Sequence, residues 1–183
     1  MTEKFPRAKK LGYSTEEVDA FLELARTQYL NPEASEVDTK TLRDTRFKLV
    51  KNGYSITAVD AAMEKLEDIF ASRELEQLMK SIGFSNFLSE VNQIRDLLES
   101  RVSRAKRKKF SKRTWPFRGY NRKQVDAFCS RIATYLKAES ELSVRDVRIE
   151  VFKSKRGGYA EHQVDAFMDK VVELLQRVAI INS

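Results

Sequence analysis

The stretch Arg118–Phe128, RGYNRKQVDAF, decides the fold, because the same pattern occurs four times along the chain. The other copies are LGYSTEEVDAF (Leu11–Phe21), NGYSITAVDAA (Asn52–Ala62) and GGYAEHQVDAF (Gly157–Phe167). Their tyrosines are 41, 66 and 39 residues apart, so the copies form two pairs. Self-similarity of this kind indicates one structural unit used repeatedly. The shared positions are Gly12, Tyr13, Val18, Asp19, Gly53, Tyr54, Val59, Asp60, Gly119, Tyr120, Val125, Asp126, Gly158, Tyr159, Val164 and Asp165.

Each copy predicts the start of a helix. In three copies the residue after the tyrosine is a good N-cap, and in three copies Glu or Gln follows three residues later. The caps are Ser14, Ser55 and Asn121, and the later residues are Glu17, Gln124 and Gln163. This spacing predicts capping boxes, and the tyrosine and valine are spaced as a hydrophobic staple. Ala160 at a cap and Ala58 three residues after Ser55 depart from the pattern. One aspartate per copy, next to a helix start, favours a structural role.

The residues after each motif keep a helical period. Val125, Phe128, Cys129 and Ile132 are spaced i, i+3, i+4 and i+7, as an amphipathic helix requires. The sequence predicts helices over 14–30, 55–82, 86–108, 121–139 and 160–180, with short helical turns at 39–45 and 142–148. The fold class is therefore all-α, built from tandem helical repeats.

Composition narrows the function further. The chain of 183 residues holds six glycines and three prolines, which disfavours a fold of strands and turns. Its net charge of +7 suits nucleic acid or an anionic membrane without selecting either. The lone Cys129 excludes internal disulfides and is expected in the core, and the lone His162 has no neighbours at metal-ligand spacing. With no secretion signal, spanning segment, phosphate loop or catalytic carboxylate pair, we expect a cytoplasmic protein that is not an enzyme and has no catalytic residues, cofactor or metal.

The repeated motif resembles the N-terminal domain of DivIVA, the bacterial scaffold of poles and septa. That domain has an aromatic residue, a short basic stretch and RGY-x-x-x-x-VD-x-F at the start of a coiled-coil helix. Phe110–Phe128, FSKRTWPFRGYNRKQVDAF, is the copy most similar to it. The resemblance covers about 25–30 residues of each copy, and this chain lacks the long C-terminal coiled coil of DivIVA.

The resemblance implies an arrangement of the four copies. The DivIVA domain is a parallel dimer with interlocked loops, so two tandem copies are expected to form a coiled-coil-like pseudo-dimer within one chain. The predicted domains are a first pair over 1–82, a connecting helix and basic tract over 83–109, and a second pair over 110–183.

A basic tract links the two pairs. Eleven Lys or Arg lie between 101 and 123 with no Asp or Glu among them: Arg101, Arg104, Lys106, Arg107, Lys108, Lys109, Lys112, Arg113, Arg118, Arg122 and Lys123. In the resembled family the aromatic residue and the arginine before Gly-Tyr contact the membrane, which maps onto Phe117 and Arg118. Together with Trp115, Lys112 and Arg113 these are the candidate membrane-contact residues. A solvated helix end with aromatics packed locally, or a nucleic-acid contact, would produce the same composition.

The function expected from the resemblance is a non-enzymatic adaptor of cell division or polar growth. It would act at the septum or pole by helix–helix protein interaction, with peripheral contact to the inner face of the membrane and a capacity for self-association. A basic nucleic-acid-associated protein that uses 101–123 is the alternative, although no copy carries its own basic recognition helix. A regulator that blunts DivIVA assembly is a third hypothesis.

Overall fold

The computed structural model describes residues 5–31, 37–114 and 116–182, and this part of the chain is mostly helical. The helices are α1 (Thr15–Leu30), α2 (Thr39–Asp44), α3 (Ile56–Ile82), α4 (Phe84–Val102), α5 (Arg122–Leu136), α6 (Val144–Arg148) and α7 (Glu161–Ile181). The helical class is thus confirmed, and most helices lie within a few residues of their predicted ranges. The motif glycines and tyrosines lie in or beside four three-residue strands that were not predicted: β1 (Leu11–Tyr13), β2 (Leu49–Lys51), β3 (Arg118–Tyr120) and β4 (Ser154–Arg156).

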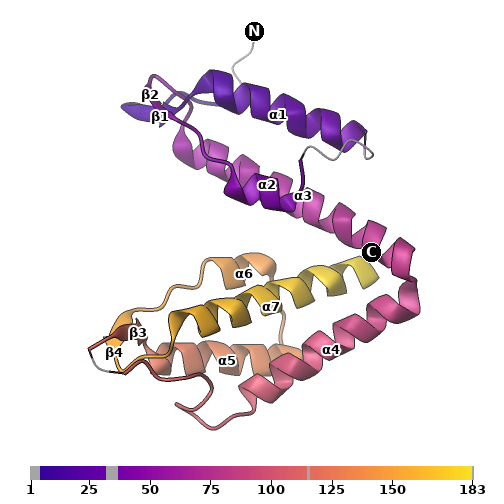
Figure 1. The fold of residues 1–183 in the computed structure, drawn as a ribbon, viewed down its shortest axis with the longest axis vertical. Coiled ribbons are helices and arrows are strands. Elements are labelled where there is room, and N and C mark those ends of the chain that lie inside the picture. The colour runs from indigo at the N-terminus through magenta and orange to yellow at the C-terminus, as the bar shows by residue number, and fades with distance from the viewer. Residues whose placement is uncertain (1–4, 32–36, 115, 183) are drawn as a thin grey trace. The chain divides into compact units, whose positions relative to one another are not determined.

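The chain divides into two compact units, residues 1–74 and 75–183. Helix α3 begins in the first unit and its last turns belong to the second (Figure 1). In the first unit β1 pairs antiparallel with β2, with Gly12 opposite Val50. Its core holds Val18, Tyr54 and Val59 near the strands. A second cluster, under α2, holds Ala25, Val37, Leu42 and Phe70.

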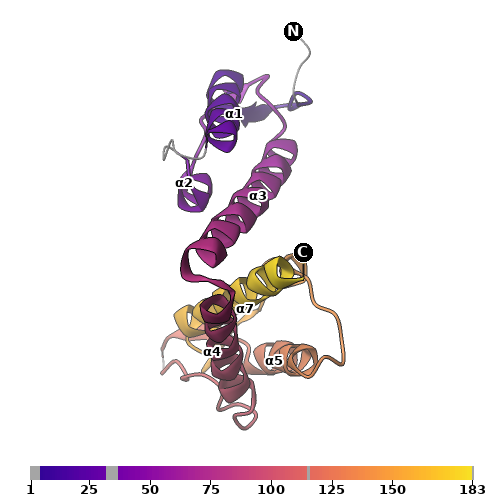
Figure 2. The same cartoon turned by 90° about the vertical axis from the view of Figure 1, so that its right-hand side faces the viewer.

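The second unit repeats this plan and adds a helix. Strand β3 pairs antiparallel with β4, and α5 and α7 begin beside them (Figure 1). Helix α4 packs against both α5 and α7 (Figures 1 and 2). The α4 side chains of Phe87 and Leu98 are fully buried in the common core. This differs from the sequence-based division, in which 83–109 was a separate connector, because the apolar stripe of α4 is covered by the second pair of copies. Leu75 and Leu78 of α3 pack on the same core, so the boundary falls before residue 75 rather than after 82.

Helix α4 ends at Val102, earlier than the predicted 108. The buried Lys109 explains the early end, because its ammonium donates to the carbonyls of Val102 and Arg104 at the end of the helix. A cation at that position also offsets the negative end of the helix dipole. Arg107 takes a left-handed backbone conformation, with φ of 63°, as the chain turns back.

At the centre of each unit, the backbones of two motif tyrosines are joined by a pair of hydrogen bonds. The amide of Tyr13 donates to the carbonyl of Tyr54 (3.0 Å), and the amide of Tyr54 donates to the carbonyl of Tyr13 (2.8 Å). Tyr120 and Tyr159 exchange the same two bonds at 3.0 and 2.8 Å. The preceding glycines allow this approach: a Cβ on Gly119 would lie 2.1 Å from the carbonyl oxygen of Tyr159. The motif glycine is therefore required for close backbone contact.

The predicted capping boxes do not form at the motif helices, because the Glu or Gln side chains reach across to the other copy of the pair. Glu17 accepts from the amide of Lys48 (2.8 Å), and Gln124 accepts from the amide of Lys153 (2.9 Å). Gln163 likewise accepts from the amide of Ser111 at 2.9 Å. The caps Ser14 and Asn121 do accept from amides of their own helices, as predicted.

The departure at Ala58 has a structural reason. Lys48, Lys153 and Ser111 each also accept, through their carbonyls, from the amide of the cap residue in the other copy. The residue in the same role for Ser55 is Pro6, whose carbonyl accepts from the Ser55 amide at 2.8 Å. A proline has no amide hydrogen to donate. The side chain that would receive this bond is absent as well, since position 58 is alanine.

Replacing Gly119 with alanine should destabilise the second unit, because the added Cβ would overlap the Tyr159 carbonyl. Overpacking of this kind costs about 1–3 kcal/mol. The sole cysteine, Cys129, is fully buried in this unit and burial raises the pKa of its thiol to about 12, so its alkylation rate reports opening of the unit. We expect alkylation of Gly119→Ala to be about fivefold to 150-fold faster than in the wild type. The control is Lys155→Ala, at the exposed β4 position opposite Gly119, and an equal effect of both substitutions would contradict the close-approach explanation.

Glu17 should make the first unit sensitive to acid. Its bond to the Lys48 backbone amide is the main cause that holds the pKa of this carboxyl below its usual value. A lowered folded-state pKa means that the contribution is present above the unfolded pKa, near 4.3, and is lost as pH falls through the folded value. Glu17→Gln keeps an acceptor for Lys48, as Gln124 does for Lys153, and should flatten the decline in stability of residues 5–74 between about pH 5 and 3. Hydrogen exchange measures this decline, and Glu23→Gln on the same helix should leave it unchanged.

Candidate functional site

The tyrosines of each pair are held by aspartates of the opposite copy. The hydroxyl of Tyr159 donates to Asp126 at 2.9 Å, and the hydroxyl of Tyr54 donates to Asp19 at 3.2 Å. Burial, and then a hydrogen bond to Asp60, raise the pKa of Tyr13 above its usual value. All four motif copies therefore use the same crossed contact, since the pKa of Tyr120 is raised in the same way by burial and Asp165.

An aromatic ring from the segment before each motif packs on the tyrosine of the other copy. The ring centroids are 5.3–5.4 Å apart in all four pairs, which are Phe5 with Tyr54, Phe47 with Tyr13, Phe110 with Tyr159, and Phe152 with Tyr120. Three of these contacts are edge-on and the one between Phe152 and Tyr120 is tilted. Ring contacts at this distance add to the energy of apolar burial. The motif positions thus form the structural centre of each unit. The candidate site must therefore lie on the exposed ends of the loops.

The basic tract is not one continuous surface. Lys109 is buried, and its main-chain amide donates to the Tyr159 hydroxyl at 3.2 Å. Arg101 lies over the ring of Phe110 at 5.2 Å and donates to the Lys109 carbonyl. The amide of Arg107 donates to Asp126 at 2.7 Å, which fastens the loop to α5. Part of the charge that the sequence placed on a contact surface therefore serves the fold.

The candidate membrane-contact residues lie around β3. Phe117 is 56% exposed, and the guanidinium of Arg113 lies over its ring at 5.1 Å. Arg118 is exposed in β3, where its guanidinium donates to the hydroxyl and the carbonyl of Ser154 on β4. Lys112 is exposed and bridges to the backbone of Tyr159. Trp115 lies outside the described residues. The structure thus gathers four of the five candidates at one exposed end of the second unit.

Sequence reasoning missed that β4 lies beside β3 and adds its own cations there. Arg156 is opposite Arg118 in the strand register, and Lys155 is opposite Gly119. All three residues of β4 are exposed. The cationic tip, defined here as Lys112, Arg113, Phe117, Arg118, Lys155 and Arg156, therefore draws on the third and the fourth motif copies. The pairing of the copies in the sequence could have indicated this, because paired copies place their loops side by side.

The corresponding end of the first unit exposes apolar strand residues beside its own cations, Arg7, Lys9, Lys10 and Lys51. Its strands expose Leu11 by 50%, Leu49 by 53% and Val50 by 37%. Lys51 lies opposite Leu11, in the position that Arg156 takes opposite Arg118. The two units thus present different chemistry at equivalent places.

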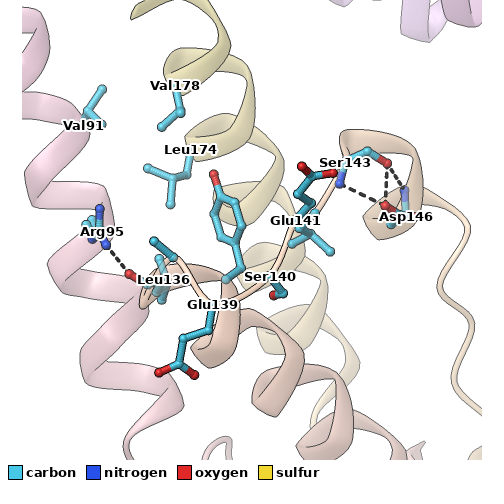
Figure 3. Close-up of a pocket in the computed structure, with 13 residues that line it drawn as sticks. Val91, Arg95, Leu136, Glu139, Ser140, Glu141, Ser143, Asp146, Leu174 and Val178 are labelled. Atoms are coloured by element: carbon cyan, nitrogen blue, oxygen red, sulfur yellow. Dashed lines mark hydrogen bonds between the residues drawn. The ribbon is translucent and has the colours of Figure 1, made fainter. Parts of the chain in front are cut away.

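A pocket of about 760 Å³ lies at the other end of the second unit, among α4, α7 and the segment between α5 and α6. Figure 3 shows Val91 of α4 facing Leu174 and Val178 of α7 across it. Arg95 donates to the Leu136 carbonyl, and Ser143 and Asp146 form a capping box at the start of α6 (Figure 3). The pocket's polar groups named here thus hold the fold, and its lining includes no His, Cys or Lys.

Comparison with known proteins yields no match among family models, curated proteins or solved structures. Among the described residues, no group of three or more His, Cys, Asp or Glu is placed to hold a metal ion. Within the same residues, no helix is long and apolar enough to cross a membrane.

Tyr159→Phe should destabilise its unit more than Tyr54→Phe destabilises the first. The Tyr159 hydroxyl is buried, donates to Asp126 and accepts from the Lys109 amide. The Tyr54 hydroxyl has a longer hydrogen bond, to Asp19 at 3.2 Å. Removing the Tyr159 hydroxyl leaves two buried hydrogen-bonding groups without this partner, at a cost of about 1–3 kcal/mol. Hydrogen exchange of α5 and α7, compared with that of α1 and the start of α3, measures the two effects. Equal losses of protection would show that the rings, rather than the hydroxyls, supply the stability.

Proposed function

We propose that this chain is a non-enzymatic adaptor built from DivIVA-like repeats, in which each pair of copies forms an intramolecular pseudo-dimer. The observation that carries the proposal is the crossed tyrosine pairing, repeated in both units, which sets the loops of two copies side by side. Interlocked loops beneath two parallel helices are the arrangement that the resemblance implies.

The surface proposed to act is the cationic tip. Each cation beside an anionic membrane contributes about 1 kcal/mol. Burial of the exposed Phe117 ring in the acyl boundary would add roughly 1.5–3 kcal/mol. A ring flanked by arginines from β3 and β4 combines both terms and gives reversible peripheral binding.

We place this activity at the inner face of the membrane, at the septum or pole of a bacterial cell, where the resembled scaffold works. The helices would offer faces to proteins of the division or polar-growth machinery. The proposed role is that of an adaptor whose paired units carry the contact surfaces.

Phe117→Glu should weaken binding to vesicles that contain anionic phosphatidylglycerol, measured by co-sedimentation. Arg118→Glu should weaken it as well, and it should flatten the dependence of binding on salt, because the lost cation was screened by salt. The uncharged variant Phe117→Ala should also weaken binding but keep the steep salt dependence of the wild type, since it removes an apolar contribution without changing the charge. Far-ultraviolet circular dichroism of all three variants should match that of the wild type.

The matched control is Ile149→Glu, which places the same charge at a 64% exposed residue of the second unit away from β3 and β4. It should bind vesicles like the wild type. If folded Phe117→Glu also binds like the wild type, the cationic tip is not a membrane contact. A gel shift with random duplex DNA at matched salt then tests whether the tip binds nucleic acid instead.

A further inference from the structure

The two units differ in one respect that the motif does not explain: the second has a helix, α4, over the groove between its two motif helices. Aligning Tyr13 with Tyr120 and Tyr54 with Tyr159 makes α1 equivalent to α5 and α3 equivalent to α7. Helix α4 contacts both α5 and α7. It contributes Phe87, Val91 and Leu98 to the buried core.

Two buried positions beside α4 are apolar in the first unit too, but there they are exposed. Leu136 of α5 is 3% exposed, whereas its equivalent on α1, Tyr29, is 50% exposed. Leu174 of α7 is 2% exposed, whereas its equivalent on α3, Ile69, is 47% exposed. Tyr29 and Ile69 thus leave apolar surface exposed on the first unit at positions that are buried in the second.

A polar contact of α4 is also replaced in the first unit. In the second unit Arg95 of α4 donates to the carbonyl of Leu136. In the first unit the equivalent carbonyl, that of Tyr29, accepts from Arg73 of α3, whose guanidinium lies 5.0 Å from the Tyr29 ring centre. The end of α1 is therefore satisfied without a covering helix, and the apolar surface around Tyr29 and Ile69 remains open in the described residues.

The charges beside this face indicate the kind of helix that would fit. Lys65 and Arg73 occupy the positions equivalent to Lys170 and Val178, which line pockets beside α4 in the second unit. Two copies meeting face to face would bring these cations together, which disfavours self-association here. A helix with carboxylates beside its apolar stripe would complement Lys65 and Arg73, although the pair that Glu90 of α4 forms with Arg177 at 2.8 Å has no equivalent here, because Ser72 takes the place of Arg177.

We propose that the α1–α3 face, defined as Tyr29, Lys65, Ile69 and Arg73, binds one acidic amphipathic helix of a partner protein, in the position that α4 takes in the second unit. The pattern required is that of α4, in which Phe87, Val91, Ile94 and Leu98 follow spacings of four, three and four. This inference rests on the proposed adaptor function, but its test involves no vesicles, so the two can fail separately.

The probe is a fluorescent peptide with the sequence of residues 84–102, titrated into the full chain. Wild-type protein should bind it saturably below about 1 mM. Ile69→Glu should weaken binding about tenfold or more, since an apolar contact is replaced by a charge. Lys65→Glu should also weaken binding and reduce its salt dependence. A peptide with aspartate at the positions of Val91 and Leu98 should not bind.

The matched control is Leu24→Glu, on α1 of the same unit. Leu24 is 38% exposed and equivalent to Arg131, which pairs with Glu150 beyond α6 and so lies away from α4. This variant should bind the peptide like the wild type. Loss of helicity in Ile69→Glu is checked by circular dichroism, and Tyr29→Ser provides a second, uncharged test of the same face.

Three results would overturn the proposal. The first is a lack of saturable binding by the wild type, and the second is binding that survives both Ile69→Glu and Tyr29→Ser. The third is a wild-type dimer in sedimentation equilibrium that Ile69→Glu converts to a monomer, because a second copy would then occupy the face. A monomeric wild type, with binding lost in both face variants and kept in Leu24→Glu, would support a partner helix.

Discussion

The exchange of two backbone hydrogen bonds between tyrosines of paired copies is the constraint on which each unit depends. It brings two loops within van der Waals reach at Gly12 and Gly53, and again at Gly119 and Gly158. A side chain at any of these positions would overlap backbone atoms of the other copy. The glycine, the tyrosine and the aspartate of the motif are thus parts of one contact: the first allows the approach, the second makes the bonds, and the third holds the tyrosine.

Two departures from the motif in the first pair are matched across that pair, as this constraint predicts. Where the loop residue is Pro6, which has no amide hydrogen, the opposite helix has Ala58 instead of an acceptor. Where Phe47, Phe110 and Phe152 pack on a phenylalanine of the opposite helix, Phe5 has Ala62 at the equivalent position. When one residue of such a contact is absent, the residue that would contact it in the other copy is not needed either. The crossed pairing therefore explains why Ala58 and Ala62 depart from the motif.

The helices could be predicted from the sequence because their signals are local. Each signal, such as a cap residue or the spacing of apolar side chains, is contained within a few helical turns. These signals predict the first residues of α1 and α5 to within one residue of their positions in the structure. The contacts between copies could not be predicted this way. A capping box and a bond to a neighbouring loop need the same residue type at the same position, so Glu17 and Gln124 fit both. The choice depends on which amide the opposite loop presents.

The candidate site shows the same limit. Eleven cations without a carboxylate between 101 and 123 suggested a single contact surface, yet Lys109 is buried at the end of α4 and Arg101 lies against Phe110. The burial of these two side chains depends on where α4 ends and on Tyr159, which is 50 residues from Lys109. The cationic tip lies where β3 meets β4, and two of its five cations, Lys155 and Arg156, come from a copy whose own sequence has no aromatic tip.

Once the centre of each unit is held by its tyrosines, the exposed positions are free to differ, and the two units have diverged there. Residues 1–74 carry 12 Lys or Arg and 14 Asp or Glu, whereas residues 75–183 carry 22 and 13. The basic unit has both its cationic tip and a helix of its own over its motif helices. The other has an apolar strand end and an open helical face. In the two proposals above, duplication of one framework would separate attachment to an anionic surface, through the second unit, from recognition of a protein helix, through the first. Such a separation would suit an adaptor, because a cationic surface held against a membrane is occupied by lipid and is poorly placed to select an acidic partner.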